Sequence, residues 1–420
     1  MADQGVFDLR RLDLEGLDLG DIDLAALDLQ TPEVRANPYD LYRRLREVAP
    51  IVPAPFDQDT FLLTSFADGE AVLRDPRWST NPAHRPVPDG PLDVRTEMSL
   101  SGSQVLLFID PPDHTRLRKL VSKAFTPRTV VRLRPRVEQL VDELLDAAEA
   151  RGELDIVSEL GYLLPFKVIC EMIGVPTDDV ERFGPWSSDA SRLLDGVLDE
   201  ETTNRGLLGA MSIIAYLNDL IELRRAEPRD DLLSALIAVE EEGDRLAEDE
   251  LRSIVLLLFI AGHETTMNLI GNGMYALLRN RDQFERLRAD PTLIGTAVEE
   301  LLRFDGPVHI SGRVAVTDVE VNGHEFAAGD QVLTVLAAAN RDPARFTDPD
   351  SLDVGRDEGP HLTFSYGIHY CLGAALARLE GQVVIGSLVQ RFGDMEIVTD
   401  PVTYRDHFVL RGLKELQVSV

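Results

Sequence analysis

The sequence predicts a mainly α-helical protein with small β-sheets, in which one large helical domain follows a short N-terminal extension. Three observations carry this prediction. Apolar residues recur at helical spacing through residues 114–240, with breaks at prolines and glycines. Residues 248–280 then form one helical pattern, about 33 residues long and roughly 50 Å at 1.5 Å per residue. Strand-like alternation is confined to short segments, and no linker divides residues 32–420.

The extension comprises residues 1–31 and is acidic. Residues 6–30 divide into five pentads, each with an Asp-Leu pair, and residues 1–30 hold eight acidic side chains against two arginines. Five short pentads offer too few contacts for an independent domain, so we expect an acidic extension that lies on the surface or moves freely. Docking of another protein on the pentads is the alternative.

Short elements and a long loop are expected before residue 114. Residues 39–46 repeat apolar side chains at helical spacing, and residues 51–65 alternate like a hairpin broken by Pro53 and Pro55. Residues 79–104 show no clear periodicity, which predicts a long loop. A loop of that length inside a compact domain usually serves a function.

Prolines and glycines predict the helix boundaries in the middle of the chain. Breaks are expected at Pro127, Pro135, Gly152, residues 174–176, residues 184–185 and Pro228. The long helix over 248–280 is weakly capped, because Glu250 can form half of a capping box while Ala247 offers no hydroxyl in return.

Two small sheets are expected near the C-terminus. Residues 313–335 alternate around an Asn322-Gly323 pair, which is a hairpin turn signal. Residues 395–420 predict another small sheet.

The composition excludes several classes of protein. The chain of 420 residues carries 73 acidic and 42 basic side chains, a net charge of −31, which argues against nucleic-acid and anionic-lipid partners. Two cysteines, Cys170 and Cys371, are too few for a disulfide framework, so we expect a cytoplasmic protein. The longest apolar run, residues 254–261, is far shorter than the about 20 residues that span a bilayer, so no membrane anchor is expected.

The strongest chemical signal surrounds Cys371. This cysteine lies between Gly367 and Gly373 at the start of a helical pattern. A helix N-terminus lowers the pKa of a thiol, and the two glycines permit close approach of a large flat group. A thiolate ligand to haem iron fits these features.

Residues 364–373 resemble the haem-binding signature of the cytochrome P450 superfamily, with Phe364, Gly367, His369, Cys371 and Gly373 at its positions. Soluble bacterial members usually carry glycine where this chain has a serine at 365. The resemblance covers residues 32–420. It implies the P450 fold, with haem between the long central helix and the cysteine segment. It further implies Cys371 as the axial iron ligand, Phe364 beside the thiolate and His369 on a haem propionate. No C-x-x-C-H motif occurs, so haem b bound without a covalent link is expected.

Glu300 and Arg303 are spaced three apart, so both lie on one face of a helix. Alone, such a pair is usually a solvated surface contact. Its position before Cys371 resembles the family's E-x-x-R motif. That resemblance implies a buried network completed by Arg356, which serves architecture and haem loading.

Residues 261–266, Ala-Gly-His-Glu-Thr-Thr, resemble the family's oxygen-activation motif in the middle of the long helix. Small side chains at Ala261 and Gly262 would leave room for a diatomic ligand. Thr265 can hydrogen-bond back to the Ala261 carbonyl and locally open the helix. Glu264 and Thr265 together can relay protons to bound O₂.

Basic side chains for the haem propionates are expected in two further places. His114 and Arg118 lie four residues apart on one helix face and resemble the family's H-x-x-x-R pair. Arg313 matches another propionate-binding arginine of the family.

The implied activity is a monooxygenation of a hydrophobic small molecule: a lipid, terpenoid, steroid or polyketide. Electrons are expected from NAD(P)H through a reductase and a ferredoxin. The candidates for lining the substrate site are Leu257, Ile260, Val308, His309, Ile310, Phe408 and Val409. His309 either contacts a polar substrate group or is satisfied by the protein itself.

Two other functions and one partner surface follow. The chain could oxidise an acyl group tethered to a carrier protein, or it could be a non-catalytic haem sensor, which the Glu264-Thr265 pair argues against. Residues 116–136 hold eight basic side chains and no acidic one, so an acidic ferredoxin is expected to dock there. A monomer is expected.

Overall fold

We analysed a computed structural model of the chain, which describes residues 31–54, 57, 59–86, 94–100, 105–176, 179–195, 198–241 and 244–420. The acidic pentads lie outside the described residues. The N-terminal half contains α1 Pro32–Ala36, α2 Tyr39–Val48, β1 Ile51–Pro53, β2 Thr60–Leu63, α3 Phe66–Arg74, β3 Trp78–Ser79, α4 Val94–Leu100, α5 Asp113–Ala124, α6 Pro127–Arg151, β4 Glu153–Asp155, α7 Leu163–Ile173, α8 Val180–Ser191 and α9 Glu200–Ala226.

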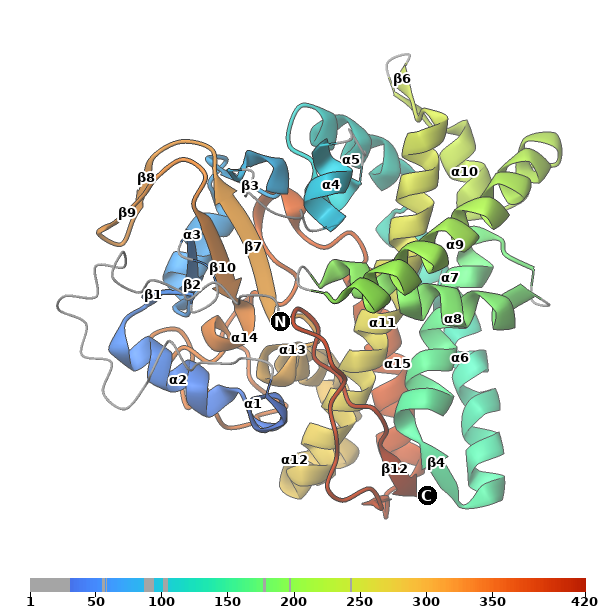
Figure 1. Cartoon of the computed structure of the whole chain (residues 1–420). Helices are drawn as coiled ribbons and strands as arrows, with labels where there is room; N and C mark the ends of the chain where they lie inside the picture. Colours follow the sequence, from blue (N-terminus) through green and yellow to red (C-terminus); the bar gives the residue numbers. More distant parts are fainter. Residues whose placement is uncertain are drawn as a thin grey trace.

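The C-terminal half contains α10 Leu232–Ala238, β5 Glu240–Glu241, β6 Asp244–Arg245, α11 Glu248–Arg279, α12 Arg281–Ala289, α13 Ile294–Asp305, β7 Ile310–Ala315, β8 Val319–Val321, β9 His324–Phe326, β10 Gln331–Val335, α14 Leu336–Ala339, α15 Ala374–Arg391, β11 Glu396–Ile397 and β12 Gln417–Ser419. Figure 1 shows most of the long helices on one side of the molecule and the largest sheet, with α2, α3 and α14 beside it, on the other.

The largest sheet has five strands in the order β1-β2-β10-β7-β3. β1 and β2 form the antiparallel hairpin predicted over 51–65, and β10 lies parallel to β2 and antiparallel to β7. The turn at Asn322-Gly323, with φ of 50° and 78°, joins β8 to β9 as predicted. The small C-terminal sheet predicted over 395–420 is present: β11 pairs with β12, β12 pairs with β4 from the N-terminal half, and most of residues 398–416 lie outside strands.

The long helix predicted over 248–280 is α11, which has 32 residues. Its weak start matches expectation, because Glu250 Oε2 accepts the Ala247 amide at 2.8 Å and Ala247 returns no side-chain bond. The helix runs through the core beside α7, α13 and α15 (Figure 1). Ile270 and Met274 of α11 are fully buried, as is Ile385 of α15. The core therefore forms around α11.

Two predicted helix breaks are wrong. Pro135 lies inside α6 and Pro185 lies inside α8. A proline removes one backbone hydrogen bond and favours a kink, but burial of the surrounding apolar face can outweigh that cost. In α6 the buried face includes Val137, Leu140 and Val141, which pack in the main core. The breaks at Gly152 and Gly174 are present, and both glycines have left-handed φ angles of 76° and 95°.

The long loop predicted over 79–104 is also partly wrong. Its described residues include the short helix α4, and residues 82–84 form one helical turn. Asn81 caps that turn, because its side chain accepts the Ala83 amide at 2.9 Å. An asparagine directly before a proline is a typical N-cap signal, which the prediction of a loop overlooked.

Two helices among the described residues are long and apolar enough to cross a membrane, α9 and α11. Two-thirds of the apolar window of α11 is buried inside the protein, so core packing accounts for its hydropathy. α9 packs along α8.

Candidate haem site

Residues 362–374, which we call the Cys371 loop, lead into α15. The Cys371 amide donates to the Phe364 carbonyl at 2.9 Å and closes the loop. Gly367 has a φ of 68°, and a Cβ there would lie 2.6 Å from the Leu73 carbonyl oxygen. The close approach of α3 therefore requires glycine at this position.

Ser365 shows what the departure from the family signature means. Its φ is 60°, in the left-handed region, which costs a residue other than glycine about 1 kcal/mol or more. The loop keeps this turn, and the Ser365 amide donates to the Leu362 carbonyl at 2.7 Å. The serine thus adopts the backbone conformation for which glycine is suited.

The Cys371 side chain is in contact with solvent, but many protein atoms surround it. These atoms displace water from around the thiol, and this desolvation raises its pKa. The amides of Gly373 and Ala374 at the N-terminus of α15 oppose the shift, as do the charges of Arg118 and Arg378. A bound metal cation would supply the remaining stabilisation of the thiolate. An accessible thiol in such surroundings fits a ligand of iron.

Four basic side chains lie together beside the Cys371 loop, and we call them the basic cluster: His114 and Arg118 of α5, Arg313 of β7, and His369. The ring centroids of His114 and His369 are 4.2 Å apart. Burial lowers the pKa of all four groups, that of Arg313 to about 10 and that of His369 to about 3. The positive charges of Arg313, His114 and Arg118 lower the pKa of His369 further.

The basic cluster fits an anionic ligand. His114 is 2% exposed, and neither of its ring nitrogens has a hydrogen-bond partner among the described residues. Arg118 donates to the Tyr370 carbonyl at 2.6 Å, and Asp110 supplies one nearby negative charge. Buried cationic groups crowded in this way are unfavourable until anions pair with them. The two carboxylates of haem meet this need, so the residues present fit haem with Cys371 on the iron.

The segment 261–266 lies in the middle of α11. Thr265 Oγ1 donates to the Ala261 carbonyl at 2.9 Å, which is the contact that we predicted. The predicted local opening is absent, because α11 remains helical throughout this segment. The Thr265 hydroxyl donates to the Ala261 carbonyl in addition to the helical backbone hydrogen bond and does not replace that bond.

Glu264 is 1% exposed and lies among cationic side chains. Its Oε1 is 3.3 Å from His407 Nε2 and 3.4 Å from Arg405 Nη1. Burial alone would raise the pKa of Glu264, but the hydrogen bond and charge of His407 outweigh it and hold the pKa at about 2. The sequence-based analysis did not find His407, because it is 143 residues away and no local motif marks it.

A second buried acid, Glu380 of α15, was also missed. Its side chain is 1% exposed, and both carboxyl oxygens lack a hydrogen-bond partner among the described residues. Burial raises the pKa of Glu380 to about 8, and Thr266 of α11 opposes the shift only in part. The available signal was an acid between the apolar residues Leu379 and Val383 of a buried helix.

Glu380→Gln should remove a pH dependence of stability. The folded state holds a proton on Glu380 up to about pH 8, whereas an unfolded glutamate releases it near 4.3, so the wild type loses about 1.4 kcal/mol per pH unit between these values relative to the variant. Urea unfolding of both holoproteins at pH 5, 6, 7 and 8 measures the difference. Parallel stability curves would contradict a neutral Glu380.

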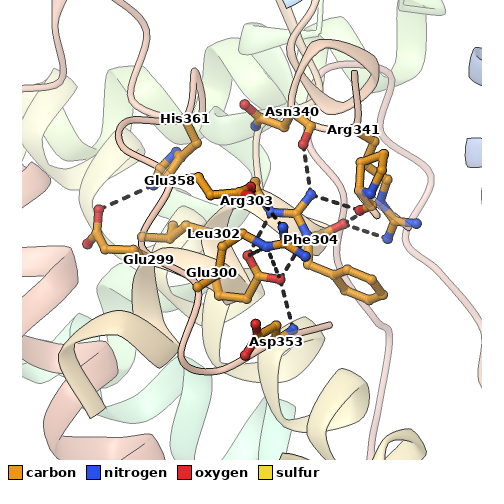
Figure 2. Close-up of polar contacts among 12 residues, drawn as sticks. Glu299, Glu300, Leu302, Arg303, Phe304, Asn340, Arg341, Asp353, Glu358 and His361 are labelled. Carbon is orange, nitrogen blue, oxygen red and sulfur yellow. Dashed lines mark hydrogen bonds and ion pairs between the residues drawn. The ribbon is translucent and has the colours of Figure 1, made fainter. Parts of the chain in front are cut away.

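Glu300 and Arg303 of α13 form the buried pair that the family motif implies, with side chains 1% and 2% exposed. Arg303 Nε is 2.6 Å from Glu300 Oε2, and Arg356 Nε is 3.1 Å from the same carboxylate. Arg303 also donates to the carbonyls of Asn340 and Pro349 at 2.9 and 2.8 Å. Figure 2 shows Arg303 between Glu300 and Asn340.

The neighbouring Glu299 connects α13 to residues on either side of the Cys371 loop. His361 Nε2 lies 3.4 Å from its carboxylate (Figure 2), and Arg378 Nε donates to it at 2.6 Å. Burial would raise the pKa of Glu299, but these two partners lower it to about 2. Because the Arg378 guanidinium also lies 4.5 Å from the Phe364 ring centroid, the acid positions the side chain beside the loop.

The candidate substrate residues lie in two groups, one formed by residues 308–310 with 408–409 and the other by Leu257 and Ile260 of α11. The structure brings residues 308–310 beside 409–410: Val308 pairs with Leu410, and the His309 amide donates to the Val409 carbonyl at 2.9 Å. Phe408 is half-buried next to them, and Leu257 and Ile260 lie on α11.

The contacts of His309 and Ile310 are with the protein itself. His309 Nδ1 lies 3.4 Å from the Tyr42 hydroxyl, while His309 Nε2 lies 3.8 Å from Asp305 and has no hydrogen-bond partner among the described residues. Ile310 packs in the sheet core with Leu62.

Comparison with known proteins gives the family. The cytochrome P450 family model matches residues 202–414. The chain is 42% identical over 389 residues to the vitamin D(3) 25-hydroxylase of Pseudonocardia autotrophica, covering 91% of this chain and 94% of that protein. It is 43% identical over 399 residues to the 6-deoxyerythronolide B hydroxylase of Saccharopolyspora erythraea, covering 91% and 96%.

Solved structures agree. The structure of P450BioI in complex with acyl carrier protein ligated to hexadec-9Z-enoic acid matches with a TM-score of 0.86 and 38% identity, covering 92% of this chain and 99% of that chain. Fold and relatives together define a haem-dependent oxidoreductase. The chain belongs to the cytochrome P450 family and is a monooxygenase of the bacterial type.

Proposed function

We propose that this chain inserts one oxygen atom from O₂ into a free hydrophobic molecule of the steroid or polyketide class, with electrons from NAD(P)H through a reductase and a ferredoxin. The observation that carries the haem assignment is the basic cluster beside the Cys371 loop, with the orphaned ring of His114. The relatives act on vitamin D(3) and 6-deoxyerythronolide B by their names, which supports a bulky, mainly apolar substrate. Residues 32–420 act as one haem domain in this proposal, located in the cytoplasm, and the protein is a monomer.

Each group of side chains has one task. Haem, when bound, supplies the iron that activates O₂. Cys371 holds the iron from the N-terminus of α15, and the basic cluster orients the carboxylates of the macrocycle. The small side chain of Ala261 leaves space beside α11, while Gly262 faces Ile169 of α7. Thr265 carries a hydroxyl proton next to that space, and the ionised Glu264 accepts protons and passes them on to the reaction, which consumes two.

A substrate screen tests this function. The holoprotein is titrated with vitamin D(3), testosterone, corticosterone, 6-deoxyerythronolide B and free hexadec-9Z-enoic acid while the Soret band is followed. Compounds that shift the band are then incubated with NADPH and a surrogate ferredoxin and reductase. A product with one added oxygen is expected. NADPH consumption without product from any binding compound would favour the non-catalytic haem protein.

An acyl group on a carrier protein is the second candidate substrate. P450BioI matches 92% of this chain, and its structure is a complex with an acyl carrier protein. The same screen with hexadec-9Z-enoyl carrier protein decides between the two. A spectral shift with the carrier-bound acid and none with any free compound would favour the tethered substrate.

For the redox partner we propose that an acidic ferredoxin docks beside the Cys371 loop. Arg118 of α5 contacts Tyr370, and Arg134 of α6 donates to Gln382 of α15 at 3.3 Å, so the basic segment 116–136 flanks this loop. Exposed apolar side chains adjoin it, Val131 at 65% and Ile368 at 50%. A charged rim around apolar contacts suits transient electron transfer.

Other elements neutralise much of this basic segment. Arg116 contacts Glu250, Arg136 lies 2.7 Å from Glu171, and Arg132 lies 3.3 Å from Asp230. Arg128 is exposed and makes no such contact among the described residues. We therefore expect Arg128 to contribute more to ferredoxin docking than the other basic residues of the segment.

Arg128→Glu should slow reduction of the holoprotein by ferredoxin about tenfold at low salt, with the gap closing as salt screens the charges. Stopped-flow reduction at 20 and 500 mM NaCl measures it. Arg182→Glu, the same charge change on α8, is the matched control and should leave the rate unchanged. Equal rates for Arg128→Glu and the wild type at both salt concentrations would refute docking at this segment.

A further inference from the structure

A buried charge bridge joins three distant parts of the chain: Asp195 after α8, His407 near the C-terminus and Glu264 of α11. We call it the His407 bridge. His407 Nδ1 lies 2.9 Å from Asp195 Oδ2, and its Nε2 lies 3.3 Å from Glu264 Oε1. The side chains of Asp195, His407 and Glu264 are 2%, 6% and 2% exposed. No motif or family resemblance accounts for His407 or Asp195.

The geometry sets the charge of His407. A neutral imidazole has one N–H, so its other nitrogen would turn a lone pair toward a carboxylate oxygen. A carboxylate oxygen lies within ion-pair distance of each ring nitrogen, which favours an imidazolium, although the contact between Nδ1 and Asp195 Oδ2 is an ion pair and not an aligned hydrogen bond. Burial alone would lower the pKa of His407, but Asp195 and Glu264 raise it to about 9.

Other charged groups surround the bridge without replacing the imidazolium. They are Arg192 beside Asp195, His263 beside Glu264 on α11, Arg405 and Asp406 on the same loop as His407, and Arg35 of α1. Arg405 Nη1 donates a hydrogen bond to Glu264 Oε1 at 3.4 Å and shares this oxygen with His407, whereas Arg192 approaches Asp195 only to 3.8 Å. Arg35 is neutralised by Asp406 at 2.6 Å. His407 is the closest of these cations to each carboxylate.

The bridge also ties a loop to α11. Asp195 Oδ1 accepts the amides of Phe408 and Val409 at 3.2 and 3.0 Å, so one carboxylate holds three consecutive residues of the C-terminal loop. At the other end, His407 and Arg405 both approach Oε1 of Glu264. Glu264 Oε2 is buried and makes no well-aligned hydrogen bond among the described residues, and the Ser191 hydroxyl faces the same carboxylate and helps to lower its pKa. One oxygen of the acid thus contacts two cations, and the other faces at most the neutral hydroxyl of Ser191.

We propose that His407 is a positioning residue for oxygen activation: its imidazolium, held by Asp195, anchors Oε1 of Glu264 so that Oε2 is presented for proton transfer beside Thr265. The proposal rests on the proposed role of Glu264. It also implies that Glu264 is held in position only while Asp195 contacts residues 407–409.

The bridge predicts a specific pH dependence. A histidine whose pKa is raised on folding stabilises the fold below its unfolded pKa of about 6.5, and that stabilisation is lost as pH rises through 9. Glu264, with a lowered pKa of about 2, keeps its charge throughout this range. Coupling of NADPH consumption to product should therefore be constant near neutral pH and fall toward pH 9.

The first test measures the charge state directly. The holoprotein is labelled with ¹³C at the histidine ring carbons, and the His407 signal is assigned by its absence in His407→Gln. We expect this ring to titrate near pH 9 and to titrate at lower pH in Asp195→Asn. A His407 ring that titrates at 6 to 7, like a free histidine, would overturn the proposal whatever the enzyme's activity.

The second test measures coupling with the compound that gives the largest spectral shift. His407→Gln should lower the product formed per NADPH about tenfold, as expected when a reacting group is displaced, and should abolish the fall toward pH 9. His407→Arg, which keeps a cation with donors for both carboxylates, should restore most of the coupling. His324→Gln, a histidine of the β8–β9 hairpin, is the control and should behave as the wild type.

The outcomes separate the two proposals. If Glu264→Gln leaves coupling unchanged, the role of Glu264 and the positioning role of His407 both fail. If Glu264→Gln lowers coupling while His407→Gln does not, only the positioning role fails. Loss of coupling in His407→Gln, with rescue in His407→Arg and no change in His324→Gln, supports it.

Discussion

Cys371→Ser should abolish the red-shifted Soret band that the reduced, CO-bound protein shows with a thiolate ligand, and monooxygenase turnover should be lost with it. A serine hydroxyl is nearly the size of the thiol but stays protonated, so the electron donation of the thiolate to iron is lost. Because Cys371 lies outside the apolar core, the free energy of unfolding should change by less than about 1 kcal/mol. The CO difference spectrum and urea unfolding measure the two effects.

Cys170 provides the control within the same chain. It is fully buried in α7, and burial raises the pKa of its thiol to about 12, so it stays a neutral side chain of the core. Cys170→Ala should leave the CO spectrum intact. A wild-type spectrum from Cys371→Ser would disprove the ligand assignment.

Arg303→Ala should destabilise the protein by about 3–5 kcal/mol, because it leaves Glu300 charged and buried. The carbonyls of Asn340 and Pro349 lose their donor as well. These groups position the segment that leads to the Cys371 loop, so haem retention should fall together with stability. Urea unfolding and the haem content of the purified protein measure both.

Arg286→Ala is the matched control. Arg286 lies 2.6 Å from Asp353, next to the same network, but both side chains are nearly half exposed, at 47% and 43%. Loss of this pair should cost about 0–1 kcal/mol. If Arg303→Ala cost no more than Arg286→Ala, the buried network would not be needed for the fold.

Local patterns predicted those parts of the fold and site that are governed by neighbouring residues. The span of α11 follows from apolar periodicity alone. The Thr265 contact with Ala261 is a contact four residues back along one helix, so residue spacing reveals it. The hairpin β1–β2 and the Asn322-Gly323 turn are local in the same way.

Predictions failed where distant packing outweighs a local preference. Pro135 and Pro185 are strong helix breakers by residue type, yet both lie inside helices whose apolar faces are buried. Residues 116–136 count as strongly basic in the sequence, but Glu250, Glu171 and Asp230 from other elements lie against them. Counting charge along a segment omits such partners.

The sequence by itself determined the helical class, and its motifs, through the family resemblance, predicted Cys371 as the thiolate ligand and Glu264 with Thr265 as the acid–alcohol pair, because such motifs depend on residue type and short spacing. Only the tertiary structure decided which charges meet. It brought His407 to Glu264, left the His114 ring without a hydrogen-bond partner among the described residues and placed His309 beside Tyr42. The physical reason is that a buried charge is governed by the groups within a few ångströms of it, and those groups come from segments more than 100 residues apart.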